Sequence, residues 1–143
     1  MSELESWHTH AVRVRFQDID AAGIAFFATA FELFHDAYVE GLRAHGVELA
    51  RVLDEGRWGA PITHAEAKFR RPMRFGDALL VEVNGALSER DLTVRYRVRS
   101  ASDPSIEHVV GSTTHAFIDR ASFARCAIPP EIIRAFGRDA QGA

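Results

Sequence analysis

One stretch of this sequence, from about Ala28 to His45, repeats its apolar residues at steps of three and four, which places them on one face of an α-helix. Gly46 follows directly and is a candidate for the cap that ends the helix. The stretch therefore predicts one long helix with a wide apolar face, and such a face needs another element to cover it. The apolar stripe consists of Phe27, Phe31, Phe34, Tyr38 and Leu42.

Most of the remaining chain alternates between apolar and polar residues, which predicts half-buried β-strands. Short polar turns at Gly76-Asp77, at 88–91 and at 103–105 separate the later strands, and such turns favour antiparallel pairing. We therefore expect an α+β fold, a single domain over residues 1–143 in which a five-stranded antiparallel sheet wraps around one long helix. The expected strands cover about 10–16, 64–70, 79–83, 92–99 and 107–118; short helices are expected over about 47–53 and 128–136, and the tail from Gly137 is expected to fray.

The composition limits the classes of function. The chain has 143 residues and a net charge of −3, so it lacks the basic character of a nucleic-acid-binding protein. No run approaches the roughly 20 apolar residues of a membrane span, and Met1–Trp7 carries acids where a signal peptide has bases. Cys126 is the only cysteine, and the nearest histidine pair, His8 and His10, falls in an expected frayed terminus, so we expect no metal site. The expectation is a cytoplasmic protein that binds neither nucleic acid nor membrane.

Between the first strand and the long helix lies the stretch 16–27, which carries the carboxylates Asp18 and Asp20. The start of a helix offers unpaired backbone N–H groups and the positive end of the helix dipole. The two carboxylates could therefore cap the helix, pair with Arg13 or Arg15, or act on a substrate bound there. The residues alone leave these possibilities open, although a structural role suits Asp18 better.

The run Asp18-Ile-Asp-Ala-Ala-Gly23, followed by an aromatic-rich helix, resembles the hot dog fold thioesterases of the 4-hydroxybenzoyl-CoA type. The resemblance extends over about residues 10–120. Within that family, His35-Asp-Ala-Tyr38 and Pro61-Ile-Thr-His-Ala65 look closest to the 1,4-dihydroxy-2-naphthoyl-CoA hydrolases. Further residues similar to the strands of the family are Phe69, Pro72 and Gly76-Asp77.

This resemblance implies hydrolysis of the thioester of an aromatic acyl-CoA. Asp20 would be the catalytic carboxylate, as nucleophile or as general base toward water. The backbone N–H of Phe27 would stabilise the negative charge on the thioester oxygen, and Gly23 would let the backbone approach the substrate closely. Candidates for the acyl pocket are Phe26, His35 and His64, and candidate cations for the phosphates of coenzyme A are Arg90, Arg70, Arg71 and Arg74.

Other functions fit the same scaffold. A non-hydrolytic acyl-CoA or acyl-carrier binding protein is one alternative, but it would have no need of a carboxylate such as Asp20 near a thioester. A hot dog dehydratase is another, although its usual catalytic histidine has no clear counterpart in the loop. No cofactor is expected other than the coenzyme A of substrate and product. The family implies a homo-oligomer, a dimer or a tetramer of two dimers, with sheets joined edge to edge and the active site at the subunit interface.

Overall fold

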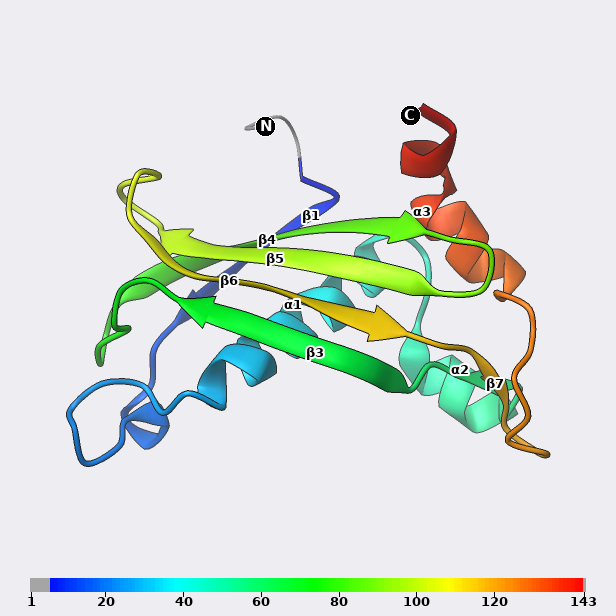
Figure 1. Cartoon of the computed structure of the whole chain (residues 1–143), viewed down its shortest axis with the longest axis horizontal. Coiled ribbons are helices and arrows are strands. Elements are labelled where there is room, and N and C mark those ends of the chain that lie inside the picture. Colours follow the sequence, from blue (N-terminus) through cyan, green and yellow to red (C-terminus); the bar gives the residue numbers. More distant parts are fainter. Residues whose placement is uncertain (1–5, 143) are drawn as a thin grey trace.

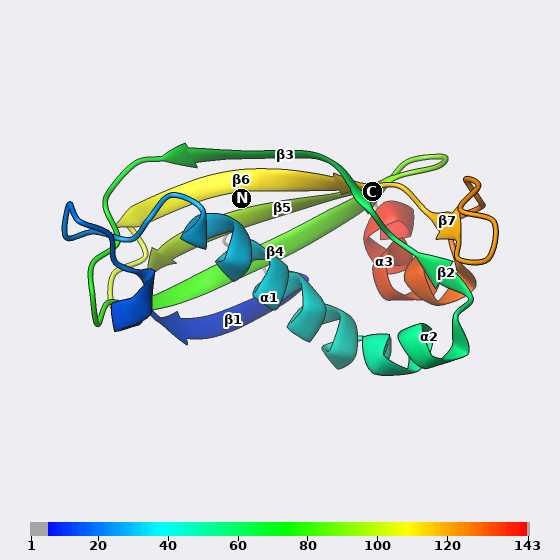
Figure 2. The same cartoon turned by 90° about the horizontal axis from the view of Figure 1, so that it is seen from below.

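The computed structural model describes residues 6–142, which form a curved antiparallel sheet with a long helix running along one face (Figure 1). The helices lie on the same side of the sheet (Figure 2). In chain order the elements are β1 (His8–Arg13), a 3-10 turn (Phe16–Asp18), α1 (Thr29–Ala44), α2 (Leu49–Glu55), β2 (Trp58–Gly59), β3 (Ile62–Phe69), β4 (Ala78–Leu87), β5 (Leu92–Ser100), β6 (Glu107–His115), β7 (Ile118–Asp119) and α3 (Pro130–Gly142).

The main sheet has five strands in the order β1-β4-β5-β6-β3, and every neighbouring pair is antiparallel. The strands β4, β5 and β6 follow one another through short turns, so each pairs with its neighbour in sequence. The strand β3 comes after α1 and α2 in the chain and pairs with β6, which makes it one edge of the sheet. β2 and β7 form a separate two-stranded sheet.

The core lies between α1 and the sheet face that it covers. Alternate residues of the central strands, among them Val81 and Val94, are completely buried on that face. Phe34 of α1 stacks on Tyr96 of β5 with ring centroids 4.4 Å apart. Gly111 of β6 lies directly beneath, and a Cβ at this position would overlap the ring of Phe34 and the backbone carbonyl of Glu66. A glycine is therefore required where the helix approaches the sheet most closely.

The α+β fold with five antiparallel strands and one long helix confirms the prediction from sequence. The first strand was predicted over 10–16, but it covers His8–Arg13, so the pair His8/His10 lies in β1 and not in a frayed terminus. The predicted strand ends early because the carboxylate of Asp18 accepts a hydrogen bond from the backbone N–H of Arg15, which turns the chain.

Two further boundaries differ from the sequence prediction. The last strand was expected to reach Ile118, but β6 ends at His115; the Ala116 N–H bonds to the carbonyl of Pro61, and Ile118 then pairs with Gly59 in the small sheet. The tail was expected to fray from Gly137, but the last helix continues through Gly142. Glycine lowers the stability of a helix without preventing helical backbone.

None of the helices within residues 6–142 has the length and apolarity to span a lipid bilayer. The signal-peptide prediction falls mostly on residues 1–5, outside the described part.

Candidate active site

The loop between β1 and α1 is held closed by Asp18, whose side chain is buried. Its carboxylate accepts a hydrogen bond from the backbone N–H of Arg15 at 2.9 Å and pairs with the Arg15 guanidinium at 2.7 Å. The side-chain hydrogen bond from Arg15 lowers the pKa of this carboxyl group below its ordinary value. The Asp18 carbonyl accepts a hydrogen bond from the N–H of Phe26 at 2.9 Å. Asp18 therefore joins the start of the loop to its end, and it has a structural role.

Asp20 begins a tight turn within this loop. The N–H of Gly23 donates to the Asp20 carbonyl at 3.0 Å, and Gly23 has a φ of +83°, a conformation that favours glycine. The Asp20 side chain is half-buried, and its Oδ1 accepts a hydrogen bond from the N–H of Ala22 at 2.8 Å. No hydrogen bond or ion pair found within residues 6–142 involves Oδ2, the other oxygen. The carboxylate is thus oriented by one oxygen while the other is left for a ligand.

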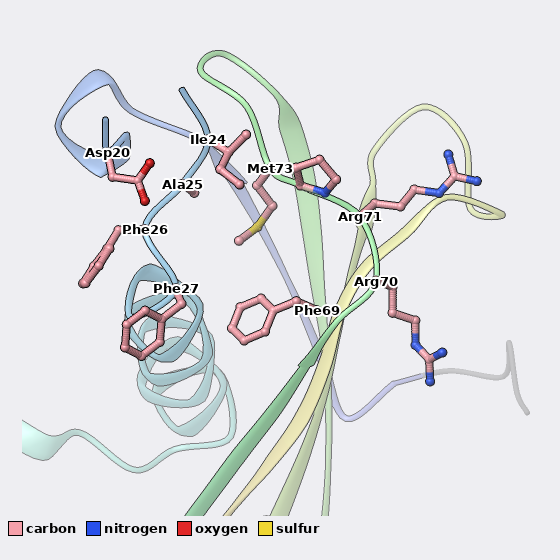
Figure 3. A pocket seen from close by; sticks show the side chains of 10 residues that line it. Asp20, Ile24, Ala25, Phe26, Phe27, Phe69, Arg70, Arg71 and Met73 are labelled. Atoms are coloured by element: carbon pink, nitrogen blue, oxygen red, sulfur yellow. The ribbon is translucent and has the colours of Figure 1, made fainter. Parts of the chain in front are cut away.

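A cavity of about 420 Å³ lies beside Asp20 (Figure 3). One wall is the end of the loop, and the other is the end of β3 with the residues that follow it. A hydrogen bond from the N–H of Ala25 to the carbonyl of Met73, 2.8 Å long, joins the two walls. Asp20 lies on one side of the cavity; Arg70 and Arg71 belong to the opposite wall, and their side chains extend away from Asp20, with apolar side chains between. The lining residues are Asp20, Ile24, Ala25, Phe26, Phe27, Phe69, Arg70, Arg71, Pro72 and Met73.

The N-terminus of α1 meets this cavity at Phe27. The carbonyls of Phe26 and Phe27 accept hydrogen bonds from the N–H groups of Thr29 and Ala30, which start the helix. Within the described part of the chain, no acceptor is found for the N–H of Phe27. An unpaired N–H at a helix N-terminus attracts negative charge. Asp20, with its carboxylate, and Phe27, with this backbone donor, therefore line the same cavity.

The structure brings together only some of the predicted site residues. Asp20, Phe26 and Phe27 line the cavity, as do Arg70 and Arg71, and Gly23 forms the adjoining turn. Sequence reasoning assigned no pocket role to five residues that also line the cavity. The alternating pattern places Phe69 on one face of its strand with Ala65 and Ala67, but it does not show that Phe69 lines a cavity. These five residues are Ile24, Ala25, Phe69, Pro72 and Met73.

Within one chain, the other predicted residues lie away from this cavity. His64 is exposed on β3 beside Glu66, with 3.0 Å between Nε2 and Oε1; it precedes Phe69 by five residues, roughly 17 Å along a strand. His35 lines a separate groove of about 510 Å³ with Phe31 and Ile62. Of the two remaining predicted arginines, Arg74 lies just after the cavity residues and its backbone N–H bonds to the Asp77 carboxylate, and Arg90 lies in the turn between β4 and β5.

The cavity opens at an unpaired edge of the sheet. β3 pairs with β6 on one side and with no described strand on the other. Its residues are exposed except for Ala67, which is half-buried. Large apolar side chains at its two ends are also exposed, Ile62 to 46 % and Phe69 to 51 %. Exposed edges with apolar side chains pair readily with another chain.

A buried polar chain crosses the core near the other end of β3. The hydroxyl of Tyr96 lies 3.0 Å from Thr113 Oγ1, which lies 2.9 Å from His115 Nε2. His115 Nδ1 lies 3.3 Å from the carbonyl of Ala60, so it carries the proton and donates it. The His115 ring also stacks on Tyr38 of α1. Burial lowers the pKa of His115 to about 4, so this imidazole is neutral near neutral pH.

Comparison with known proteins gives consistent matches. The family model of the thioesterase-like superfamily matches residues 14–136. A 1,4-dihydroxy-2-naphthoyl-CoA hydrolase of Nostoc punctiforme is 36% identical over 141 residues, covering 94% of this chain and 92% of the relative. A crystal structure of a 1,4-dihydroxy-2-naphthoyl-CoA thioesterase from Synechocystis superposes with a TM-score of 0.85 at 24% identity, covering 91% and 95% of the two chains. A Prochlorococcus marinus structure superposes with a TM-score of 0.83 at 29% identity, covering 96% and 98%.

Proposed function

Since the chain belongs to the thioesterase-like superfamily, we propose that it hydrolyses the thioester of an aromatic acyl-CoA to the free acid and coenzyme A. One observation carries the proposal: Asp20, with its carboxylate, and Phe27, whose N–H has no acceptor found within residues 6–142, line one largely apolar cavity. Thioester hydrolysis needs an attacking oxygen and a donor for the carbonyl oxygen as it becomes negative. This loop supplies both groups from a few neighbouring residues.

Asp20 acts on the thioester carbon through Oδ2, because Oδ1 is held by the N–H of Ala22. Oδ2 either attacks the carbonyl carbon, so that the C–S bond breaks and water then hydrolyses the acyl-aspartate anhydride, or it takes a proton from a water molecule that attacks. In both routes the carbonyl oxygen gains negative charge next to the N–H of Phe27. Removing a donor of this type costs about 2.7–4 kcal/mol of barrier. In the first route the departing sulfur takes a proton from solvent, and the water that opens the anhydride returns one. In the second route water adds, the C–S bond breaks, and the sulfur takes the proton that Oδ2 removed from water.

The lining of the cavity supports an aromatic acyl group. The rings of Phe26, Phe27 and Phe69 and the thioether of Met73 form its apolar part. Aromatic rings pack well against other aromatic rings and against sulfur. Relatives at 28% to 36% identity are 1,4-dihydroxy-2-naphthoyl-CoA hydrolases, which makes the dihydroxynaphthoyl thioester the first substrate to test, with hydroxybenzoyl-CoA next.

Arginines at the mouth of the cavity suit the phosphates of coenzyme A. Arg70 pairs with Glu107 at 3.2 Å and is thereby partly neutralised. No ion pair found within residues 6–142 involves Arg71, whose side chain is exposed. We assign Arg71 the main phosphate contact from this chain, with Arg70 and Arg74 beside it.

A second copy of the chain completes the site in this proposal. Antiparallel pairing of β3 with the same strand of a partner places the end of each strand beside the start of the other. Such pairing satisfies the free backbone groups of the edge and covers Ile62 and Phe69. It also brings the partner's His64 and the partner's His35 toward the cavity of the first chain. The assembly is then a homodimer, or a tetramer made of two such dimers.

Release of free thiol from a panel of aromatic and aliphatic acyl-CoA esters tests the proposal. Fast turnover of an aromatic ester and slow turnover of aliphatic ones are expected for the wild type. The control variant is Asp54→Asn, which removes an exposed carboxylate on α2, and it should match the wild type. If the protein binds an aromatic acyl-CoA tightly but releases no thiol from any ester, it is a binding protein and the proposal is wrong.

A further inference from the structure

The hairpin that follows β6 holds an exposed aromatic ring in a costly backbone conformation. Phe123 is 72 % exposed and has a φ of +61°, a value that residues with a Cβ rarely adopt. Three hydrogen bonds to Asp119 hold this conformation. The N–H of Phe123 donates to the carbonyl of Asp119 at 2.7 Å, and the Asp119 carboxylate accepts the N–H groups of Ala121 and Ser122, each at 2.9 Å. These hydrogen bonds therefore hold the backbone at Phe123 in one conformation.

The ring of Phe123 is mostly exposed and does not pack into the core of its own chain. It contributes no buried area comparable with that of Phe117, which is fully buried in the same hairpin. A glycine at position 123 would satisfy the backbone without strain. A strained residue that the fold does not need is a reason to look for an external ligand.

Cationic side chains lie on this hairpin and on the turn that it contacts. Arg125, two residues after Phe123, pairs with Asp91 at 3.0 Å, which ties the hairpin to the turn between β4 and β5. Arg90 directly precedes Asp91 in that turn, and it is exposed. The hairpin and the turn together carry one exposed aromatic ring, on Phe123, and two guanidinium groups, on Arg90 and Arg125. The Arg125 group is paired with Asp91. Stacking on a base and pairing with phosphates are the contacts that recognise a nucleotide.

The hairpin lies far from the cavity of its own chain. Both views place it, in orange, beside β7 at one end of the molecule, whereas the loop that carries Asp20, in blue, is at the other end (Figures 1 and 2). It lies on the helix side of the sheet (Figure 2). Antiparallel pairing of two β3 edges exchanges these ends. The hairpin of one chain then approaches the mouth of the partner's cavity, where Arg70 and Arg71 already lie.

We propose that Phe123 stacks on the adenine ring of the coenzyme A bound in the partner's cavity, with Arg90 and Arg125 beside its phosphates. The inference rests on the proposed thioesterase function and on edge-to-edge pairing through β3. Coenzyme A has its thioester and its adenine at opposite ends of a long flexible arm. One chain therefore binds the reacting end and the other chain binds the nucleotide.

The test compares two thioesters that share one aromatic acyl group, the CoA ester and the pantetheine ester, which lacks the nucleotide. The variant Phe123→Gly removes the ring and relieves the backbone strain, so its melting temperature should not fall. We expect KM for the CoA ester to rise about tenfold and kcat/KM for the pantetheine ester to stay at the wild-type value. Phe123→Trp should restore the low KM. Leu53→Ala, which shortens an exposed leucine on α2, serves as the matched control.

Three outcomes separate this inference from others. If Phe123→Gly leaves KM for the CoA ester unchanged, or changes both esters equally, the adenine contact is refuted. If the variant changes the sedimentation coefficient of the assembly, Phe123 is a subunit contact and the inference is again refuted. If the wild type hydrolyses neither ester, the proposed function fails first, and direct titration with adenosine 3′,5′-bisphosphate still tests the nucleotide site by comparing wild type with Phe123→Gly.

A mixed assembly tests whether the contact is made between chains. Co-expression of Asp20→Asn chains with Phe123→Gly chains yields mixed dimers in which one cavity has its own Asp20 and the partner's Phe123. These dimers should recover the low KM of the wild type for the CoA ester. A KM that stays high in the mixed dimers would show that Phe123 does not serve the partner's cavity.

Discussion

The carboxylate of Asp18 lies 2.7 Å from the guanidinium of Arg15, and its backbone carbonyl accepts the N–H of Phe26 from the far end of the same loop. The first contact fixes the start of the loop, and the second fixes its end. Asp20 and Phe27, the groups offered to the cavity, lie between or next to these fixed points. The geometry of the candidate site therefore depends on a residue that does not line the cavity.

Asp18→Ala should lower both stability and turnover. The variant removes the buried carboxylate that accepts hydrogen bonds from Arg15, and losing hydrogen bonds to a charged group costs about 1.5–3 kcal/mol of unfolding free energy. It also loosens the position of Asp20, and small displacements of a catalytic group can cost about 10²-fold in rate. Urea unfolding and kcat measure the two effects. Asp103→Ala, which removes the carboxylate of another turn, should affect stability alone; equal loss of kcat in both variants would contradict the role of Asp18.

His115 should make the protein less stable in mild acid. Its folded pKa is lowered to about 4 from an ordinary 6.5, because burial disfavours the charged imidazole. Between these values the unfolded chain binds more protons than the folded one, so stability is complete above about pH 6.5 and falls as the pH drops toward 4. The full loss is on the order of 3 kcal/mol. The unfolding free energy, measured from pH 7 to pH 4.5, should show a weaker slope in His115→Asn than in the wild type.

An exposed histidine provides the control for that slope. His64→Asn removes a histidine with an exposed side chain, so it serves as the reference for the loss of a histidine outside the core. A slope that is the same in all three proteins would show that the buried chain of Tyr96, Thr113 and His115 does not control acid stability.

Two glycine substitutions should act in opposite directions. Gly111→Ala places a methyl group against the ring of Phe34 and the carbonyl of Glu66, and such overpacking costs about 1–3 kcal/mol. Gly137→Ala in α3 meets nothing closer than 3.7 Å and should stabilise the helix by up to about 1 kcal/mol. Thermal unfolding of the two variants measures both changes. A neutral Gly111→Ala would mean that α1 can move away from β6.

A charge on the β3 edge should separate the subunits. Ala65→Asp places a carboxylate on an exposed residue of β3, where the proposed partner strand pairs, and a symmetric dimer brings two such charges to its interface. Sedimentation should show loss of the dimer, and thiol release should fall with it. Ala11→Asp puts the same charge on the opposite edge strand, β1, and should leave both measurements unchanged. If only Ala11→Asp dissociates the dimer, the interface lies at β1 and the proposed pairing through β3 is wrong.

Periodicity in the sequence was enough to predict the fold, since the step of three and four over α1 and the alternation in β4 and β5 reflect one buried face in each element. It could not predict where β1 ends, because that depends on the side chain of Asp18 bonding to the backbone of Arg15. The motif led to Asp20 and Phe27, which line one cavity. Phe69 was missed as a wall of that cavity because its position depends on the pairing of β3 with β6, far along the chain.

The buried chain at His115 shows the same limit. Thr113 and His115 are two residues apart on one strand face, but the acceptor for His115 is the carbonyl of Ala60, 55 residues away. No local pattern connects these groups. The pocket roles of His64 and His35 were predicted from a family resemblance. In a single chain both lie away from the cavity, so these roles depend on the proposed edge-to-edge dimer.

The rate of thiol release from 1,4-dihydroxy-2-naphthoyl-CoA by wild type and by Asp20→Asn tests the central claim most directly. The variant keeps the size of the side chain and the acceptor for the Ala22 N–H, but it removes the attacking or proton-accepting oxygen. We predict a loss of about 10²–10⁴-fold in kcat, with the affinity for the substrate kept, as measured by equilibrium binding to the variant. A variant that turns over as fast as the wild type would show that the chemistry is carried out by another group.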